Sequence, residues 1–493
     1  MEFFTFESVY PEVDWTIVRT VSNWIFLLAL AYYFLTNLQW YSYKIFRVLF
    51  RHHKWRWHIY YFFFPIILFI YAGDIFYLYF YIFYLPFLIY WAKYLDKPLV
   101  LTNRIGRFLF IYIALLLFDE ILHSGLSSPI KNNALYLLPL VFTIFISNAT
   151  ELVLLRQYAK VAKEKILSLQ KLKVIAITGS FGKTSLKNFL AQILSEKFQV
   201  YATPRSVNTF AGIVSDINTN LPDFSEFYVV EAGARAPGDI LQIARLVLPQ
   251  YGIVGKIGSA HMEYFKTLET IRDTKFELAQ SERMEKLYSY KDNEIPEGIS
   301  AVPFPGAMRK IVATLDGLSF ELEINQKFYA FESEILGIFN AQNIAGAIQI
   351  AYDLGMDINT IQKEVKKLAP VPHRLNRVNA NGKIILDDSF NGNLEGMLEA
   401  IRLASLHKGR KVIITPGLVE STKKENIRLA QAIDKHFAIA ILTGELNSAI
   451  LSENITIASK IILKEKRALE SVLKASTQAG DLILFANDAP SYI

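Results

Sequence analysis

The hydrophobic pattern divides the chain at about residue 155. Before that point long apolar stretches predominate, and after it short β-branched runs alternate with segments of helical periodicity. A helix needs about 20 predominantly apolar residues to cross a bilayer. On that criterion five spans are expected: residues 17–38, two helices within 59–91, about 105–122, and 134–155. The first part of the chain is therefore predicted to be a polytopic helical membrane region.

The stretch 59–91 is interpreted as a helical hairpin and not as one long helix. It has 33 residues, and its single charged residue is Asp74, which follows Gly73. Because 33 residues exceed one bilayer crossing of about 20, a tight turn at Gly73-Asp74 is expected.

The loops between these spans predict their orientation. Residues 39–57 contain five Lys or Arg and residues 93–107 contain four, whereas the N-terminus, the Asp74 turn and residues 119–133 are acidic or nearly neutral. Basic loops are retained in the cytoplasm. The N-terminus is therefore expected outside, and everything after residue 155 is expected inside.

Two other interpretations of the apolar part are a wholly buried soluble helical core and a transport pathway. A pathway usually requires ionisable groups that face the interior of the bundle. The sequence offers Asp74 at a predicted turn, and Ser147, Asn148 and Thr150 on one span. A membrane anchor or a partner-binding region is therefore preferred.

The composition agrees with this division. Of the 493 residues, 52% are hydrophobic and 20% are charged, whereas soluble chains have about a quarter charged residues. The first 155 residues hold 20 of the charged side chains, and the remaining 338 hold 78. This distribution excludes a disordered chain, a collagen-like fibre and a purely cytosolic enzyme.

Charge and cysteine usage limit the partners further. The net charge of +6 includes no Lys/Arg run of the kind that binds nucleic acid. The sequence has no cysteine, which excludes disulfides, zinc–thiolate sites and thiol nucleophiles. Any metal must therefore bind to His and carboxylate side chains.

A phosphate-binding loop is the clearest chemical motif. The run Val174–Ile177 predicts a short strand, residues 178–185 read T-G-S-F-G-K-T-S, and a helical pattern follows. In that context glycines allow backbone N–H groups to surround phosphates, Lys183 neutralises charge, and Thr184 can reach Mg²⁺. The G-x-x-G-K-T spacing is two residues shorter than the common form. We predict ATP binding by Gly179, Ser180, Gly182, Lys183, Thr184 and Ser185.

This short loop resembles that of the Mur ligase and folylpolyglutamate synthetase superfamily, and the resemblance continues in order through residues 172–493. The segments that match are Ser206–Thr209 with Gly212, Val229–Ala234, Pro237–Ile240, Ala260-His261, Thr274–Glu277, Gly337–Asn343, His373–Leu375 and Leu386–Asn393. The Asp-Asp-Ser-aromatic-Asn string is most similar to MurF-type ligases. That family implies ATP-dependent amide ligation through an acyl phosphate, in which D-alanyl-D-alanine is added to a UDP-muramoyl tripeptide.

The resemblance also implies roles for single residues. The catalytic residues would be Lys183, His261, Lys275 and Arg374. The Mg²⁺ ligands would be Thr184, Glu231, His261 and, if it carries a carbamate, Lys275. The nucleotide would also contact Asn340, Asn343, Arg374 and Asp388, and the substrates would contact Asn208, Thr209 and Asn391. Because Arg374 comes from another domain than Lys183, catalysis implies domain closure.

Each candidate also has an ordinary structural interpretation. These alternatives are a strand-end cap or ion pair for Glu231, a structural histidine for His261, a solvated helix face for Lys275 with Glu277, helix caps for Asn340 and Asn343, and a turn residue for Asp388. The order of the motifs along the chain favours the functional interpretation.

The sequence departs from the family at several positions. Phe339 replaces the usual His, Leu394 stands where Pro is usual, and residues 487–490 replace a Lys-Gly-Ser ending. Fewer than about twenty residues separate the last expected span from the Val174 strand. The small domain that holds the uridine nucleotide of the acceptor in MurF-type enzymes therefore has no room. The acceptor is either a soluble UDP-linked peptide or a related lipid-proximal precursor.

The sequence thus predicts a bacterial inner-membrane protein with its N-terminus outside and its catalytic domains in the cytoplasm. The expected parts are a region of about five spans (1–155), a linker (156–171), a P-loop α/β central domain (172–370) and a Rossmann-like C-terminal domain (371–493). The expected partners are the muramoyl peptide, D-alanyl-D-alanine, membrane lipid and cell-wall synthesis proteins, but no nucleic acid.

Two rival functions remain at the level of sequence. One is a ligase of the same superfamily that acts on a different acceptor or amino acid. The other is a membrane scaffold or nucleotide sensor that binds ATP without turnover. A scaffold has no need for Lys183, Thr184, Glu231, His261 and Arg374 together, so an active enzyme is preferred.

Overall fold

The computed structural model describes residues 14–41, 43–50, 52, 54–95, 97–125, 133–258, 262–390, 392–419, 421–444, 446–463 and 468–486. The chain forms two compact units, which divide between Arg156 and Gln157. The first unit is helical, and the second contains all the described strands.

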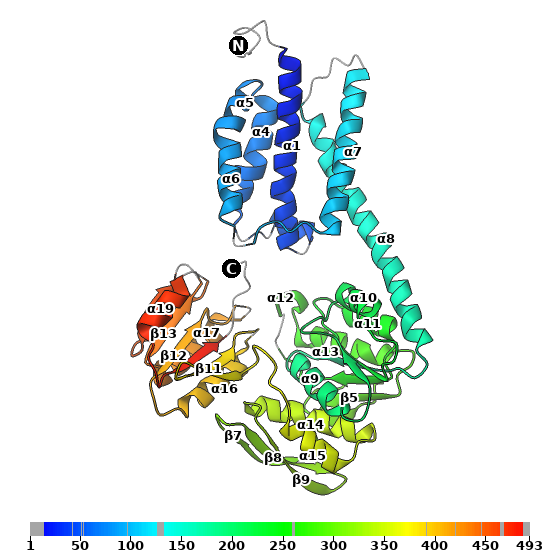
Figure 1. Ribbon diagram of the computed structural model, residues 1–493, viewed down its shortest axis with the longest axis vertical. Helices are drawn as coiled ribbons and strands as arrows, with labels where there is room; N and C mark the ends of the chain where they lie inside the picture. The colour runs from blue at the N-terminus through cyan, green and yellow to red at the C-terminus, as the bar shows by residue number, and fades with distance from the viewer. Residues whose placement is uncertain are drawn as a thin grey trace. The chain divides into compact units, whose positions relative to one another are not determined.

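The first unit is built from helices that run through each predicted span (Figure 1). They are α1 (Trp15–Trp40), α2 (Ile45–Phe50), the consecutive α3 (Arg56–His58), η2 (Ile59–Phe63) and α4 (Phe64–Tyr71), the consecutive α5 (Ile75–Tyr79), η3 (Phe80–Tyr84) and α6 (Leu85–Lys93), α7 (Asn103–Gly125), η4 (Leu135–Leu137) and α8 (Leu138–Ser168). Helix α8 continues past Arg156 into the second unit and occupies most of the expected linker.

The predicted hairpin turn is present between α4 and α5. Gly73 has φ of 56°, a left-handed conformation that glycine adopts without a steric penalty. The two arms contact each other through the rings of Phe64 and Tyr79, whose centroids are 5.5 Å apart, and through Tyr84, whose hydroxyl donates to the carbonyl of Tyr61 (3.1 Å). The turn at Gly73-Asp74 is therefore confirmed.

Three helices among the described residues, and not five, are long and apolar enough to cross a membrane. They are Trp15–Trp40, Ile75–Lys93 and Leu135–Ser168. The helical segment 56–71 reaches about 24 Å at 1.5 Å per residue, against about 30 Å for the hydrocarbon core. Helix α7 carries charged residues near both ends, which interrupt its apolar stretch.

Ion pairs join separate helical segments of the first unit. Arg19 on α1 forms two hydrogen bonds with Asp74 at the hairpin turn, at 3.0 and 2.8 Å. Arg107 on α7 donates to Glu151 on α8 at 2.8 and 2.5 Å. Pairing offsets the cost of placing these ions among apolar side chains.

The second unit begins with a six-stranded sheet in which every pairing is parallel, in the order β2-β3-β1-β4-β5-β6. Its strands are β1 (Lys173–Thr178), β2 (Val200–Ala202), β3 (Phe227–Glu231), β4 (Tyr251–Val254), β5 (Lys286–Tyr290) and β6 (Val302–Phe304). Its helical segments are α9 (Lys183–Leu194), α10 (Phe210–Thr219), α11 (Asp239–Val247), α12 (Met262–Phe265), α13 (Leu268–Phe276) and η5 (Glu277–Gln280). In parallel sheets of this class, ligands bind at the carboxyl ends of the strands.

A three-stranded antiparallel sheet and two helices follow. They are β7 (Met308–Ala313), β8 (Leu318–Ile324), β9 (Lys327–Ser333), α14 (Ile338–Asp353) and α15 (Ile358–Lys366). Strand β8 alternates buried and half-buried positions because one face packs on the core. Helix α14 is buried along most of its length, and its apolar side chains join those of α9 in one core.

The last part is a second six-stranded sheet in the order β10-β11-β15-β12-β13-β14, parallel except for β10. Its elements are β10 (Asn376–Ala380), β11 (Lys383–Asp388), α16 (Leu394–Ser405), β12 (Lys411–Thr415), α17 (Lys423–His436), β13 (Ile439–Thr443), α18 (Ser448–Asn454), β14 (Ser459–Leu463), α19 (Leu469–Ser476) and β15 (Leu482–Ala486). The sequence predicts strands at 383–386, 412–415, 438–442 and 482–485, and β11, β12, β13 and β15 are present at these positions.

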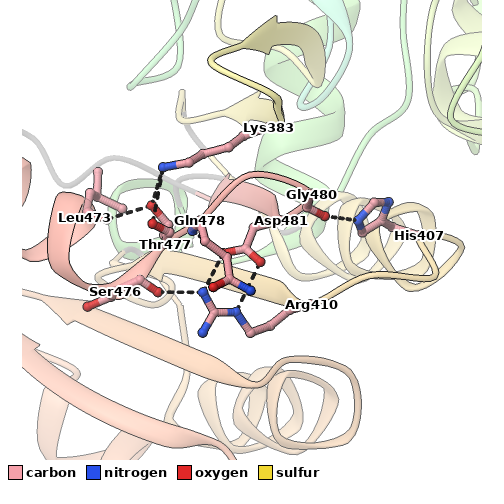
Figure 2. Close-up of polar contacts among 9 residues, drawn as sticks. All are labelled: Lys383, His407, Arg410, Leu473, Ser476, Thr477, Gln478, Gly480 and Asp481. Atoms are coloured by element: carbon pink, nitrogen blue, oxygen red, sulfur yellow. Dashed lines mark hydrogen bonds and ion pairs between the residues drawn. The ribbon is translucent and has the colours of Figure 1, made fainter.

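Polar contacts fasten the amino-terminal edge of this second sheet, opposite the carboxyl ends of its parallel strands (Figure 2). Arg410, just before β12, donates twice to the buried Asp481, just before β15, at 3.1 and 2.6 Å. Lys383, at the start of β11, donates to the hydroxyl of Thr477 (2.7 Å). These contacts hold the starts of adjacent strands in register and leave the carboxyl ends to the loops.

Candidate active site

The glycine-rich loop joins the carboxyl end of β1 to the start of α9. Gly179 has φ of 146°, and a Cβ there would lie 3.1 Å from the backbone of Gly255. Gly182 has φ of 75° and precedes the first residue of α9. The N–H of Ser180 donates to the carbonyl of Lys256 (2.9 Å). The loop therefore packs against the loop after β4 and directs the N-terminus of α9 toward its own concave side, an arrangement that favours anions.

Lys183 is the first residue of α9, and its side chain folds back over the loop. Its ammonium donates to the carbonyls of Gly179 (2.9 Å) and Ser180 (3.3 Å). Burial lowers the pKa of Lys183, and the nearby Arg374 lowers it further, while the charge of Glu231 acts in the opposite direction. The lysine thus lies at the loop with carbonyl partners that a phosphate group can replace.

Thr184 and Glu231 meet at the carboxyl ends of neighbouring strands. Glu231 ends β3 and pairs in register with Ile177 of β1, which places it beside the loop. Glu231 is 1% exposed. Thr184 Oγ1 donates to Glu231 Oε2 (2.8 Å), and Asn208 Nδ2 donates to Glu231 Oε1 (3.0 Å). Three of the predicted site residues are therefore in direct contact.

Lys275 is buried and does not form a solvated helix face. It lies near the end of α13 and is 3% exposed. Burial lowers its pKa to about 7, and the charge of Lys183 acts in the same direction. Glu277 caps another helix. Its carboxylate accepts hydrogen bonds from the N–H groups of Gly238 (2.7 Å) and Leu241 (3.0 Å) at the start of α11.

The two asparagines at the start of α14 have different surroundings. Asn340 is buried, and its amide donates to the carbonyl of Leu336 (2.8 Å). The contact is not a helix cap, because Gly337 occupies the N-cap of α14 and no side chain accepts a capping hydrogen bond there. Asn343 lies against the phosphate loop, since a Cβ on Gly182 would come within 2.5 Å of Asn343 Oδ1. Its own amide donates to Asn340 Oδ1 (3.3 Å).

Arg374 is held by strained backbone on both sides. His373 has φ of 63° and Leu375 has φ of 53°, which is uncommon for residues other than glycine. The N–H of Leu375 donates to Asp388 Oδ1 (3.1 Å), and the guanidinium lies 4.6 Å from the ring centre of Phe390. The last residue of β11 and the segment that follows it therefore fix where Arg374 lies.

Asp388 is a buried carboxyl next to this arginine. Burial raises the pKa of Asp388 to about 7, against the opposing effect of Arg374. Burial in turn lowers the pKa of Arg374, while Asp388 and Glu231 raise it. Arg374 is thus close enough to interact electrostatically with Asp388 of the second six-stranded sheet and with Glu231 of the first.

Comparison with known proteins agrees with this geometry. Residues 177–351, which include the loop, Glu231, Lys275 and Asn343, match the Mur ligase middle domain. The part of the chain that carries the glycine-rich loop is thus similar to the Mur ligases.

The curated relatives that the chain resembles carry the name UDP-N-acetylmuramoyl-tripeptide–D-alanyl-D-alanine ligase. The protein of Borreliella burgdorferi is 28% identical over 323 residues, which cover 61% of this chain and 68% of the relative. That of Escherichia coli K12 is 25% identical over 264 residues, which cover 50% of this chain and 58% of the relative. The chain thus spans about two thirds or less of the length of these two relatives.

Solved structures show the same fold. MurF of Acinetobacter baumannii superposes with a TM-score of 0.60 at 21% identity, over 67% of this chain and 77% of that one. MurF of Thermotoga maritima in complex with ADP also superposes with a TM-score of 0.60, at 23% identity, over 69% of this chain and 81% of that one.

Not every predicted site residue can be placed. His261 and Asn391 lie outside the described residues. Thr209 caps α10, because its hydroxyl accepts the N–H of Gly212 (3.3 Å). Within the described part of the chain, no group of three or more His, Asp or Glu side chains is arranged to hold a metal.

The residues that are described nevertheless fit a nucleotide with Mg²⁺. An octahedral ion at about 2.1 Å from its ligands places neighbouring oxygens about 3 Å apart, and Thr184 Oγ1 lies 2.8 Å from Glu231 Oε2. The buried hydroxyl of Thr178, at the end of β1, has no hydrogen-bond partner in the described structure. Hard oxygen donors, an unpaired hydroxyl and an open glycine loop are what such a ligand requires.

Lys187 is a residue of this site that sequence reasoning missed. It is completely buried on α9 and lies 3.8 Å from Glu231. Its position one turn after Lys183 was the available signal, since residues four apart share a helix face.

Proposed function

We propose that this protein is a Mur ligase of the MurF type, an ATP-dependent amide ligase that adds D-alanyl-D-alanine to an acceptor of the UDP-muramoyl-tripeptide class. The observation that carries the proposal is the contact of Thr184 with Glu231 beside Lys183 and the phosphate loop. The names of the curated relatives and the fold shared with MurF structures support the same chemistry.

In this proposal the γ-phosphoryl group of ATP moves to the acceptor carboxylate, and the amine of D-alanyl-D-alanine then attacks the acyl phosphate. The C–N bond forms as the C–O bond to phosphate breaks, and ADP and phosphate leave. Lys183 and Arg374 stabilise the charge on the transferring group. Thr184 and Glu231 would hold Mg²⁺, with His261 as a further proposed ligand. The ion neutralises phosphate charge when it is bound.

Lys275 is proposed to carry a carbamate. The ammonium first loses one proton. The neutral amine then attacks CO₂, a C–N bond forms as one C=O π bond of CO₂ breaks, and a second proton leaves, so the side chain changes from a cation to an anion. A pKa of about 7 leaves much of the amine neutral at physiological pH, whereas an ordinary lysine at about 10.4 is almost fully protonated. The product would add an oxygen ligand for a second Mg²⁺.

The remaining contacts are proposed by position. Gly179, Ser180, Gly182 and Ser185 surround the phosphates, Asn343 and Asp388 contact the nucleotide, and Asn208 and Asn391 contact the substrates. Asn340 and Thr209 are proposed to act indirectly, because Asn340 bonds to the carbonyl of Leu336 before α14 and Thr209 caps α10. The proposed domains are residues 172–370 for ATP binding and 371–493 for the C-terminal, Rossmann-like part, after a linker at 156–171.

The acceptor remains open between the soluble UDP-linked peptide and a lipid-proximal precursor. Both are anionic and carry the muramoyl peptide whose carboxylate reacts. The proposed location is the inner membrane of a bacterium, with the ligase part in the cytoplasm, membrane lipid around the spans and cell-wall synthesis proteins as further partners.

We propose a five-pass arrangement of the membrane part, which a reporter fused after Lys97 can test. If 56–71 and 75–93 both cross the bilayer, residues 93–107 lie in the cytoplasm, as their four Lys and Arg favour. If only the three longer apolar helices cross, Lys97 lies outside. We expect a cytoplasmic signal, with a C-terminal fusion as the cytoplasmic control. An external signal at Lys97 would contradict five passes.

The proposed activity is tested by phosphate release from the purified full-length protein. Release should require ATP, Mg²⁺, D-alanyl-D-alanine and a muramoyl-tripeptide acceptor together. Release that continues without the dipeptide would instead favour a ligase for another amino compound, and nucleotide binding without any release would favour a sensor.

A further inference from the structure

The buried ammonium of Lys187 is the least expected charge in the second unit. Lys187 is 0% exposed. Burying an ammonium costs several kcal/mol unless its donors are satisfied by well-placed partners. Burial lowers the pKa of Lys187, and the charges of Glu231 and Asp216 oppose that shift. A fold retains such a group only when its contacts compensate for the cost.

Those contacts lie in the segment that follows β2. Lys187 Nζ donates to the carbonyl of Thr203 (2.5 Å) and to that of Arg205 (2.6 Å), and it lies 3.8 Å from Glu231 Oε2. Arg205 has φ of 48°, a left-handed conformation that a non-glycine residue adopts only when its surroundings hold it there. One side chain thus ties α9 to a strained turn.

The same turn positions two groups around Glu231. Thr203 Oγ1 accepts the N–H of Glu231 (3.1 Å). Three residues after Arg205, Asn208 donates to Glu231 Oε1, and its carbonyl accepts the N–H of Gly233 (2.8 Å). The conformation of residues 203–208 therefore decides where Asn208 and the Glu231 carboxylate lie.

We propose that Lys187 is a positioning residue for the ligase reaction, which fixes residues 203–208 so that Asn208 and Glu231 face the transferring phosphoryl group. This inference rests on the proposed function. Lys187 acts through carbonyls and a carboxylate, whereas Lys183 acts on the phosphates. Loss of Lys187 should therefore reduce kcat much more than the affinity for ATP.

The test uses full-length Lys187→Met, which removes the ammonium while keeping a long side chain. We expect kcat to fall about 100-fold, because small displacements of reacting groups have effects of that size. The Kd for Mg-ATP, measured by calorimetry, should change less than about threefold. Amide hydrogen exchange should accelerate in residues 203–209 while the strands of the first sheet keep their protection.

The matched control is Lys197→Met. Lys197 also donates to a backbone carbonyl, that of Gly355 (2.7 Å), but it is exposed and lies beyond the end of α9. It should leave kcat, Kd and exchange unchanged. If Lys187→Met does not fold, Lys187→Gln, which keeps one donor for a carbonyl, should show the same pattern with a smaller effect.

Three results would overturn the proposal. They are a folded Lys187 variant with normal exchange in 203–209, an equal loss of kcat and ATP affinity, and faster exchange throughout the first sheet. Failure of the wild-type protein to ligate D-alanyl-D-alanine would instead overturn the proposed function, and the exchange measurement would still decide the role of Lys187.

Discussion

Replacing Lys183 by methionine should abolish ligation. The ammonium of Lys183 lies at the phosphate loop, hydrogen-bonded to the carbonyls of Gly179 and Ser180. Without it, the charge that develops on the transferring phosphoryl group loses its nearest cation. We expect kcat/KM to fall on the order of 1,000-fold or more, which corresponds to about 4 kcal/mol of lost transition-state stabilisation.

The measurement is the initial rate of phosphate release at varied ATP concentration, with acceptor and dipeptide saturating, which gives kcat/KM for ATP. Thermal unfolding is recorded in parallel. Lys197→Met serves again as the control, because it removes an equivalent charge from the exposed side of the domain. A Lys183→Met protein that unfolds normally and still turns over at the wild-type rate would remove Lys183 from the mechanism and with it the assignment of the loop.

Replacing Lys275 by alanine should reduce kcat about 100-fold, the usual cost of losing a group that supports a bound metal. If the side chain acts as a carbamate, short carboxylates such as acetate should restore part of the activity, because they supply the missing oxygen ligand. The Lys275→Ala variant should then respond to acetate in a concentration-dependent way, while the wild-type protein should not.

The pH dependence of Lys275 follows from its pKa of about 7. Carbamate formation needs the neutral amine, whose fraction rises as the pH rises through 7 and falls below it. Wild-type kcat should therefore decrease below about pH 7, and added bicarbonate should partly reverse the decrease. An alanine variant that no carboxylate rescues, together with a wild-type rate that bicarbonate does not change, would leave Lys275 without a carbamate.

The sequence was sufficient where local pattern determines structure. The order strand, glycine-rich loop, helix requires only glycines at positive φ and an apolar run, and both lie within residues 174–194. The turn at Gly73 and the strands of the second sheet followed for the same reason. Glu231 was found because the segment Val229–Ala234 resembles that of MurF-type ligases, and the structure places it as the last residue of the buried strand β3.

Features that depend on distant segments could not be predicted in this way. The burial of Lys187 arises because residues 203–205 fold across α9 and present two carbonyls. The helix-capping role of Glu277 depends on α11, which lies some forty residues earlier in the chain. Three helices meet the length and hydropathy that a span requires, and five spans stay a prediction, because hydropathy alone does not weigh the short reach of 56–71 or the charges of α7.

The measurement that most directly tests the central claim is the mass of the ligation product. Purified full-length protein is incubated with Mg-ATP, D-alanyl-D-alanine and a UDP-muramoyl-tripeptide, and the acceptor is analysed by mass spectrometry beside the Lys183→Met control. We predict that the acceptor gains the mass of one dipeptide less one water, with one ADP formed per product and neither formed by the control. ADP formation without the heavier acceptor, or no reaction in the wild-type protein, would contradict the assignment as a MurF-type ligase.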